Sequence, residues 1–299
     1  MLSSEVQPIG SVLMPQSGVA SSDACDMPDE SKPQDVSDVL VESSCDGSQS
    51  PDGTIPATCR MCGGRTDLAP VHEVWTEPGY RFWRCRDCGS ETSDLAYQLV
   101  WYEDFRRDDY FLTQCGGWDN VLAQLNFNVE LFEGWSGGSG SLHGKRFLDV
   151  GYCDGAMLAR MTEKGCECWG YDVSAEYSMK IAERAEIPHQ RLVHGLEKWT
   201  HLAGEIGTFD LVQAREVIEH VPNPWSFMRG IASLLAPGGL AQIQTPLPNG
   251  VNSRIPYQRF HITLLSPIML RAVGMAYGLE VVDNRFWSIG HLVILRKPV

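Results

Sequence analysis

The stretch that decides the fold is Phe147–Leu158, which reads FLDVGYCDGAML. It combines an apolar strand that ends at Asp149, a tight turn with Gly151 and Gly155, and the start of a helical pattern. A second apolar run ends in GYDVS, where Asp172 follows Gly151 by 21 positions. An acid at the end of this second strand, about 20 residues beyond the first glycine, can accept hydrogen bonds from both hydroxyls of a ribose. The two stretches together predict a nucleoside-binding site.

The residues of the turn distinguish between two kinds of nucleoside ligand. A dinucleotide site has a second glycine that lets backbone amides approach a pyrophosphate, whereas this position is Cys153 here. Asp149 and Asp154 flank the turn, and two carboxylates would repel a diphosphate. S-adenosylmethionine has no phosphate and carries a cationic ammonium and a sulfonium. The turn therefore favours S-adenosylmethionine over NAD; the alternative is an ordinary strand-to-helix turn without a ligand.

Strands and helices alternate from this stretch to the C-terminus. Strands are predicted at 146–151, 167–173, 191–195, 209–215 and 239–245, with helical patterns between them. Such alternation predicts an α/β fold with a parallel sheet. Two helices have clear starts, at Asn223 and at Ser266, each followed by proline. The last two apolar runs, 279–286 and 291–295, are too close for a crossover helix and should form an antiparallel hairpin.

Four motifs in this order resemble those of the class I S-adenosylmethionine-dependent methyltransferases. They are LDVGYCDG (148–155), GYDVS (170–174), FDLVQAREVIEHVPNP (209–224) and LLAPGGLAQIQTP (234–246). The resemblance runs from about Lys145 to the C-terminus. It implies a Rossmann-like sheet of seven mostly parallel strands with an antiparallel C-terminal hairpin. The cofactor residues that we expect are Asp149, Gly151 and Gly155 at the methionine end, Asp172 at the ribose, Val173 and Leu196 at the adenine ring, and Glu197 at its amino group. Cys153 departs from the family, because many members have glycine there.

Four cysteines form a second motif. Cys59 and Cys62 are a CxxC pair, and Cys85 and Cys88 form another pair after 22 intervening residues. Glycine follows each pair directly, which allows the tight turns that aim backbone amides at thiolates around one Zn²⁺. Disulfides or a redox CxxC are the alternatives, but a disulfide needs an oxidising compartment and the N-terminus shows no secretory signal. Since four cysteines leave no open position for water, we expect a structural zinc ion.

The acidic residues are concentrated at the N-terminus. The 299 residues have a formal net charge of −14, and residues 1–55 contribute −9 through ten acids and one lysine. This segment is rich in Ser, Asp and Pro, a composition typical of disorder. The rest of the chain has no dense cluster of Lys and Arg beyond Arg106 and Arg107, which disfavours a nucleic-acid partner. No apolar run approaches the roughly 18 residues of a membrane span. We expect a cytoplasmic enzyme.

These observations predict four segments. They are a disordered acidic tail (1–55), a zinc-ribbon module (56–94), an aromatic helical lid with a Gly/Ser hinge (95–144), and an S-adenosylmethionine-binding methyltransferase domain (145–299). The aromatic residues of the third segment either hold the zinc module against the sheet or cover the acceptor. The resemblance implies the second role, and it makes Tyr102 and Tyr110 the candidates for substrate contact.

Glu219 and His220, directly after the predicted fourth strand of the sheet, are the candidate catalytic pair. Methyl transfer from an activated sulfonium requires an aligned acceptor and the removal of one proton. A histidine with a pKa near neutrality, oriented by an adjacent carboxylate, suits the second task. We therefore expect His220 to be the base and Glu219 to orient it, the alternative being that the pair only caps a turn. His261 resembles a family position that faces the substrate pocket, but a structural histidine is equally compatible with its surroundings.

The acceptor is less constrained than the cofactor. A four-cysteine module before a class I domain with a Glu-His turn resembles the C-methyltransferases of nucleotide-linked sugars, so we expect a sugar or glycan precursor, methylated on carbon or oxygen. Those enzymes usually continue with a further domain, whereas this sequence stops after the predicted seventh strand. An O-methyltransferase of a quinone or phenolic metabolite fits the same turn equally well. Two other classes are an RNA or protein methyltransferase whose zinc module reads the substrate, which the acidic charge disfavours, and a binding protein without activity, which the intact acidic and histidine positions disfavour.

Overall fold

The computed structural model describes residues 59–64, 69–70, 82–93, 118–153, 155–173, 186–195, 199, 201–248, 261–287 and 290–299. All of them belong to one compact unit, 49–299. The predicted tail 1–55 and the candidate residues Tyr102, Tyr110, Leu196 and Glu197 lie outside the described residues. Within the described ranges, no helix is long and apolar enough to cross a membrane.

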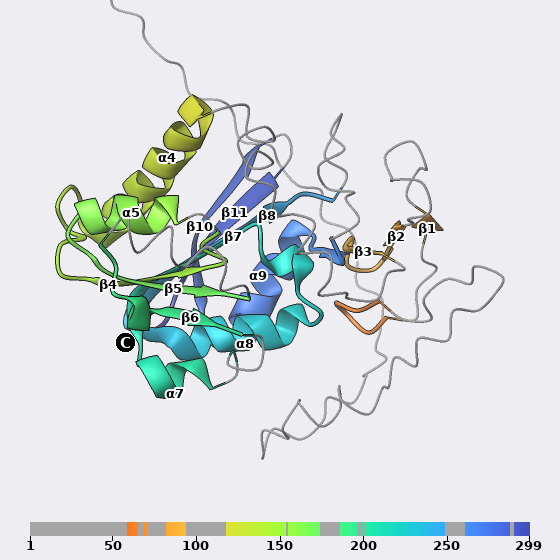
Figure 1. The fold of residues 1–299 in the computed structure, drawn as a ribbon. Helices are drawn as coiled ribbons and strands as arrows, with labels where there is room; N and C mark the ends of the chain where they lie inside the picture. The colour runs from red at the N-terminus through yellow and green to blue at the C-terminus, as the bar shows by residue number, and fades with distance from the viewer. Residues whose placement is uncertain are drawn as a thin grey trace, which may run out of the picture. The chain divides into compact units, whose positions relative to one another are not determined.

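Seven strands of the described residues form the main sheet, in the order β10-β11-β8-β7-β4-β5-β6 (Figure 1). Their bounds are β4 Arg146–Val150, β5 Glu167–Asp172, β6 Leu192–His194, β7 Phe209–Arg215, β8 Leu235–Pro246, β10 Glu280–Trp287 and β11 Gly290–Arg296. The five strands from β4 to β8 pair in parallel with one another. Strand β11 is antiparallel to both β8 and β10. The predicted parallel sheet with an antiparallel C-terminal hairpin is confirmed.

Strand β8 begins four residues earlier than the sequence pattern predicted. Its register against β7 jumps, because Phe209 pairs with Leu235 and Leu211 pairs with Leu240. The extra residues form an irregularity at the start of the strand. A Cβ atom at Gly239 would lie 2.8 Å from the Ala236 carbonyl oxygen and 2.9 Å from that of Phe209. The proline and glycines at the start of β8 are typical of a loop in the sequence. In the structure, however, this segment already pairs with β7.

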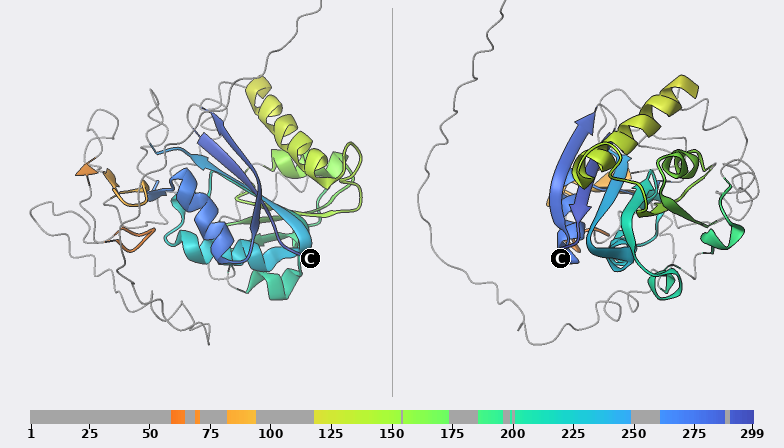
Figure 2. Two further views of the ribbon diagram at one scale, coloured as in Figure 1. Left: turned by 180° about the vertical axis from the view of Figure 1, so that it is seen from behind. Right: turned by 90° about the vertical axis from the view of Figure 1, so that its left-hand side faces the viewer.

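Helices cover both faces of the sheet (Figures 1 and 2). Helices α4 (Trp118–Ser136) and α5 (Ala156–Glu163) pack on one face, where Phe132 meets the Phe147 ring edge-on at 5.9 Å. Helices α7 (Leu202–Ile206), α8 (Pro224–Leu234) and α9 (Pro267–Ala276) pack on the other face. Each face thus has its own buried apolar cluster, and the strands between them are buried on both sides, as expected for parallel sheets.

The two helix starts predicted from the sequence are confirmed. The Asn223 side chain accepts a hydrogen bond from the Ser226 amide at 3.0 Å at the start of α8. The Ser266 hydroxyl accepts one from the Met269 amide at 3.3 Å at the start of α9. Each bond satisfies an amide that has no partner inside its helix.

A second, smaller sheet has the order β1-β2-β3-β9. Strands β1 (Ala69–Pro70), β2 (Phe82–Arg84) and β3 (Glu91–Ser93) belong to the cysteine-containing part of the chain. The fourth strand, β9 (Thr263–Leu264), comes from the C-terminal part that holds the main sheet and pairs with β3. The two parts that the sequence suggested as separate modules therefore share a sheet. A two-residue strand has no periodicity that a sequence pattern would reveal.

Candidate functional site

The predicted cofactor turn, residues 151–155, lies between β4 and α5. Gly151 and Gly155 have φ angles of +75° and +74°, a left-handed conformation that glycine adopts without strain. A Cβ atom at Gly151 would lie 2.5 Å from Cγ2 of Val217. This glycine therefore lets the cofactor turn approach the segment that follows β7.

Asp172 lies beside this turn. Its Oδ2 accepts a hydrogen bond from the Cys153 amide at 3.2 Å. Strands β4 and β5 are parallel neighbours, so that their carboxyl ends meet at one edge of the sheet. The structure thus brings together the glycine turn and the carboxylate predicted to bind ribose. Asp149 is buried in β4, and Val173 is half-buried directly after β5.

The end of β5 is tied to the segment after β6. The Tyr171 hydroxyl donates to the Gly195 carbonyl at 2.9 Å, and the Gly195 amide donates to the Asp172 carbonyl at 3.3 Å. A further contact joins the Tyr152 hydroxyl to Nε2 of His194 at 2.5 Å. Burial raises the pKa of Tyr152, so the phenol stays protonated. Nothing in the sequence pointed to Tyr152 or His194, because two residues 42 positions apart leave no spacing signal.

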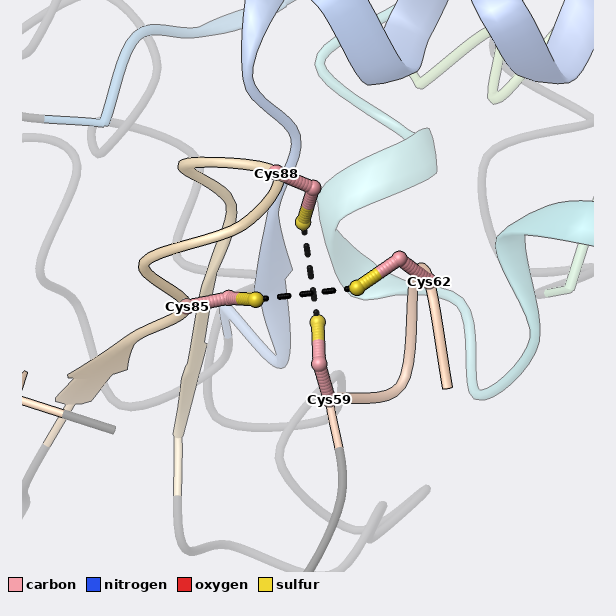
Figure 3. Close-up of side chains that lie close together, drawn as sticks. All are labelled: Cys59, Cys62, Cys85 and Cys88. Atoms are coloured by element: carbon pink, nitrogen blue, oxygen red, sulfur yellow. Dashed lines mark hydrogen bonds between the residues drawn. The ribbon is translucent and has the colours of Figure 1, made fainter. Parts of the chain in front are cut away.

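The four cysteines form a cluster in which all sulfurs lie within 4.8 Å of one another. Their side chains point toward one common centre from two turns (Figure 3). The Sγ atoms of Cys59 and Cys88 are 3.7 Å apart, and those of Cys62 and Cys85 are 3.6 Å apart. Four sulfurs at about 2.3 Å from a tetrahedral Zn²⁺ lie roughly 3.8 Å from each other. The donor set and the distances fit such an ion.

Both cysteine turns have the same backbone construction. The Gly63 amide donates to the Cys59 carbonyl and the Gly89 amide donates to the Cys85 carbonyl, each at 2.9 Å. These glycines have φ angles of +67° and +70°. The Met61 amide, in turn, points at the Cys59 sulfur at 3.4 Å. The turns that the sequence predicted, with amides aimed at sulfur, are therefore present.

The four-cysteine cluster is joined to helices α8 and α9. The Trp225 indole donates to the Met61 carbonyl at 3.0 Å. The Ser266 hydroxyl donates to the Cys88 carbonyl at 2.6 Å, and the Ser266 amide donates to the Ser90 hydroxyl at 3.0 Å. Met61 is buried in the same apolar cluster as α8 and α9. Metal binding there would consequently affect the helices that support the main sheet.

Glu219, His220 and His261 form a third group, which we call the Glu-His-His cluster. One possible ligand atom from each lies within 4.8 Å of the others. Glu219 and His220 belong to the 3-10 turn η4 (Ile218–His220) after β7, and His261 precedes β9. The Ile262 amide donates to the Glu219 carbonyl at 2.7 Å, which holds the two segments together. The rings of His220 and His261 meet edge-on with their centroids 4.8 Å apart.

The carboxylate of Glu219 is fully buried. Its Oε2 accepts a hydrogen bond from the Thr245 hydroxyl at 3.0 Å. Its Oε1 lies 3.8 Å from Nε2 of His220, which is longer than a hydrogen bond. Burial raises the pKa of Glu219 well above its ordinary value, and repulsion by the Glu216 carboxylate adds to this effect. Sequence reasoning identified the three members of the cluster but missed Thr245.

Comparisons with known proteins indicate a methyltransferase domain. Residues 136–284 match a family model described as a methyltransferase domain. A ubiquinone biosynthesis O-methyltransferase from Bordetella avium (strain 197N) is 38% identical over 112 residues, which cover 34% of this chain and 42% of that protein. One from Vibrio parahaemolyticus serotype O3:K6 is 34% identical over 128 residues, which cover 39% and 47%. The chain spans less than half the length of these relatives.

A solved structure supports the fold. A SAM dependent methyltransferase from Archaeoglobus fulgidus has a TM-score of 0.52 at 16% identity, covering 64% of this chain and all of that one. The Gly turn after β4, the acid at the end of β5 and the seven-stranded sheet lie within or beside the matched region. Residues 136–284 are therefore a class I S-adenosylmethionine-dependent methyltransferase domain.

Proposed function

We propose that this protein transfers the methyl group of S-adenosylmethionine to a small-molecule acceptor. The observation that carries the proposal is the contact between two parts of the site. The cofactor turn approaches Val217 so closely that only glycine fits at position 151, and Val217 precedes Glu219 by two residues. The nucleoside-binding edge and the Glu-His-His cluster are therefore neighbours at the carboxyl ends of β4 and β7.

The proposed cofactor contacts are those expected from the sequence. Asp172 would bind the ribose hydroxyls, and Asp149 with Gly151 and Gly155 would surround the methionine end. Val173, and in the segment after β6 also Leu196 and Glu197, would contact the adenine. Two carboxylates near a ligand that carries an ammonium and a sulfonium are electrostatically favourable. When bound, S-adenosylmethionine supplies a methyl group on a positively charged sulfur, which needs no further activation.

The chain's own residues then have to align the acceptor and remove one proton. His220 is the candidate base, because its side chain is only partly buried, at 14% exposure, whereas Glu219 and His261 are buried. Glu219 is 3.8 Å from the His220 ring and orients it at most weakly in this arrangement. For a hydroxyl acceptor, the proton passes to His220, the oxygen bonds to the methyl carbon, and the carbon–sulfur electron pair stays on sulfur.

We favour a hydroxyl acceptor, such as a phenol or a sugar. The two curated relatives named above are O-methyltransferases of ubiquinone biosynthesis, which supports oxygen as the methylated atom. The four-cysteine module before the domain supports the sugar or glycan precursor expected from the sequence. Helix α4 reaches the site edge, since the Arg215 guanidinium donates to the Gln124 side chain at 2.7 Å. This supports substrate contacts by Tyr102 and Tyr110 in the segment that precedes α4.

We also infer that Cys59, Cys62, Cys85 and Cys88 hold one structural Zn²⁺. Four thiolates close the coordination shell, so the ion would not bind water or acceptor. Its role would be to fix the two cysteine turns, and through them the Cys88 carbonyl that accepts from Ser266. Such a site contributes folding free energy rather than chemistry.

The test is the release of S-adenosylhomocysteine from S-adenosylmethionine with a panel of acceptors. The panel contains vicinal diphenols and nucleotide-linked sugars, and we expect turnover with at least one of these classes. Asp172→Asn removes the charge that binds ribose and should weaken S-adenosylhomocysteine binding by about tenfold or more, which corresponds to roughly 1.4 kcal/mol. Glu205→Gln, an exposed carboxylate in α7, is the matched control.

Two outcomes would refute the proposal. If the wild-type protein does not bind S-adenosylhomocysteine, the cofactor assignment is wrong. If it binds this product but methylates RNA or protein rather than any small molecule, the acceptor assignment is wrong and the cysteine module becomes the reader of the macromolecule.

A further inference from the structure

The side chain of Tyr152 joins three parts of the cofactor site. Tyr152 lies in the cofactor turn between Gly151 and Cys153, and it is buried, at 3% exposure. A Cβ atom at Gly170 would lie 2.5 Å from Cδ1 of Tyr152, so the ring packs on the β5 backbone where a side chain would clash. Its hydroxyl reaches across β5 to β6 and contacts Nε2 of His194 at 2.5 Å. The turn after β4 is thereby connected to the end of β6.

This hydrogen bond has a defined direction. Burial and the nearby charge of Asp172 raise the pKa of Tyr152, so the phenol keeps its proton. The Tyr152 hydroxyl therefore donates, and Nε2 of a neutral His194 ring accepts. The two rings meet edge-on with their centroids 5.9 Å apart. The bond is lost when either the hydroxyl or the ring acceptor is removed, whereas a side chain with an acceptor near the position of Nε2 preserves it.

The turn that Tyr152 anchors contains a strained residue. Cys153 has a φ angle of +48°, and such a conformation persists only where the surrounding contacts determine it. Two hydrogen bonds hold the turn against β5. The Gly151 amide donates to the Tyr171 carbonyl at 2.7 Å. The Cys153 amide donates to Oδ2 of Asp172 at 3.2 Å. The Tyr152 side chain adds a connection to β6.

The orientation of Asp172 depends on this turn. Its Oδ2 accepts from the Cys153 amide, so a displaced turn would let the carboxylate rotate. An acid that binds both hydroxyls of a ribose needs a fixed orientation, because the two hydrogen bonds form together only in one geometry. Tyr152 itself is buried. Its effect on the cofactor would therefore pass through the Cys153 amide to Asp172.

The same hydrogen bond fixes the adenine side of the site. His194 is the last residue of β6, and Gly195 and the expected adenine contacts 196–197 follow it directly. His194 pairs with Asp172 across the two strands, and the Gly195 amide donates to the Asp172 carbonyl at 3.3 Å. Tyr152 thus connects the turn to the strand end from which the adenine segment begins.

We propose that Tyr152 and His194 are positioning residues for the adenosyl half of the cofactor. Their hydrogen bond holds the cofactor turn and the end of β6 at the spacing that the ribose and the adenine require. This inference deepens the proposed function and rests on it, because it takes S-adenosylmethionine as the ligand. The acceptor is bound elsewhere, at the Glu-His-His cluster. Loss of the hydrogen bond therefore weakens binding of the adenosyl group and leaves the methyl-transfer step unchanged.

The first test is calorimetric titration with S-adenosylhomocysteine and with 5′-methylthioadenosine, which lacks the amino-acid part. Tyr152→Phe keeps the ring on the β5 backbone and removes only the hydroxyl. We expect this variant to bind both ligands about tenfold more weakly than the wild type. Tyr277→Phe, which changes a partly buried tyrosine at the end of α9, is the matched control and should bind as the wild type does. Unchanged affinity in Tyr152→Phe, or a loss confined to S-adenosylhomocysteine, would overturn the proposal.

Rescue at His194 is the second test. His194→Leu removes the acceptor and should weaken both ligands as Tyr152→Phe does. His194→Gln offers a carbonyl oxygen near the position of Nε2 and should restore most of the affinity. Once Tyr152→Phe is also present, the leucine and glutamine variants should no longer differ, because the donor is gone. His194→Asn, whose oxygen lies too far from the hydroxyl, replaces the leucine variant if that one does not fold. Equal affinities of the glutamine variant and the variant without an acceptor would contradict the role of the hydrogen bond.

Turnover with an acceptor from the panel above provides the third test. In Tyr152→Phe the KM for S-adenosylmethionine should rise about tenfold, while kcat and the KM for the acceptor stay as in the wild type. A lower kcat with an unchanged KM for S-adenosylmethionine would overturn the proposal. Failure of the wild-type protein to bind S-adenosylhomocysteine would instead refute the proposed function, so the two failures are distinguishable.

Discussion

At the scale of single residues, Cys153 is the position at which the cofactor turn differs from many family members, which have glycine there. Its φ angle is +48°, a conformation that costs a side-chain-bearing residue about 1–3 kcal/mol. We expect Cys153→Gly to tighten S-adenosylhomocysteine binding and to raise the free energy of unfolding by about 1 kcal/mol, after the entropy cost of glycine is subtracted. Calorimetric titration and urea unfolding measure both. Cys153→Ala keeps the strained Cβ and should gain nothing; an equal gain in the alanine variant would contradict the role of φ.

Glu219 is the residue where stability and activity should oppose each other. Burial and Glu216 raise its pKa, so the folded state keeps a proton that the unfolded chain has lost. This contribution to stability is lost as the pH rises through the folded pKa. We expect Glu219→Gln to raise Tm more at pH 8 than at pH 4.5, and to lower turnover, because it removes the charge beside the His220 ring. A variant with lower Tm at pH 8 would show that the carboxylate is stabilising when ionised.

His291 in β11 gives a second dependence on pH, with the opposite sign. The ring is fully buried, and burial with the nearby charge of Arg271 lowers its pKa to about 4. Below pH 6.5 the unfolded chain takes up a proton on this histidine that the folded chain excludes. The free energy of unfolding therefore falls as the pH decreases toward 4. Between pH 7 and pH 5 the loss is about 2 kcal/mol. Urea unfolding of His291→Gln should lack that loss, whereas His189→Gln, an exposed control, should retain it. Equal losses in both variants would rule out His291 as its source.

At the scale of elements, Ser266 serves two structures at once. It caps helix α9 through the Met269 amide, and it donates to the carbonyl of Cys88. Asn223 caps α8 and is a matched control. We expect Asn223→Ala to cost about 1 kcal/mol of unfolding free energy and Ser266→Ala to cost about 2 kcal/mol, since a second hydrogen bond is lost. Equal costs, measured by urea unfolding, would mean that the bond to Cys88 contributes nothing.

The elements also show how much of the fold the sequence alone predicts. Strands β4 to β8 and the caps of α8 and α9 were predictable, because apolar runs and capping residues act within a few positions of the chain. The pairing of β3 with β9 was not, since Thr92 and Thr263 meet across most of the domain. In the site, the glycine turn and Asp172 followed from local spacing. The closeness of His261 to Glu219, in contrast, depends on a contact between distant segments that only the fold reveals.

At the scale of the whole molecule, the four-cysteine cluster and the methyltransferase domain should unfold together. Cys59 and Cys85 are buried in the same apolar cluster as α8 and α9, and β3 pairs with β9, which follows His261 of the Glu-His-His cluster. Loss of the ion at the cysteines would loosen β3 and with it the position of His261. The damage should therefore reach the catalytic edge, while the cofactor turn on β4 is affected less.

We expect Cys62→Ser, which alters an exposed member of the cluster, to release zinc and to lower Tm by several degrees in one cooperative transition. Turnover should fall more than S-adenosylhomocysteine affinity, because Glu219 accepts directly from the Ile262 amide beside β9, whereas the cofactor turn reaches that segment through Val217. Metal content, calorimetry and binding measure the three effects. Cys166→Ser, a buried cysteine outside the cluster, should keep its zinc. Two separate unfolding transitions in the wild type, or full turnover in zinc-free protein, would show that the cysteine cluster is an independent module.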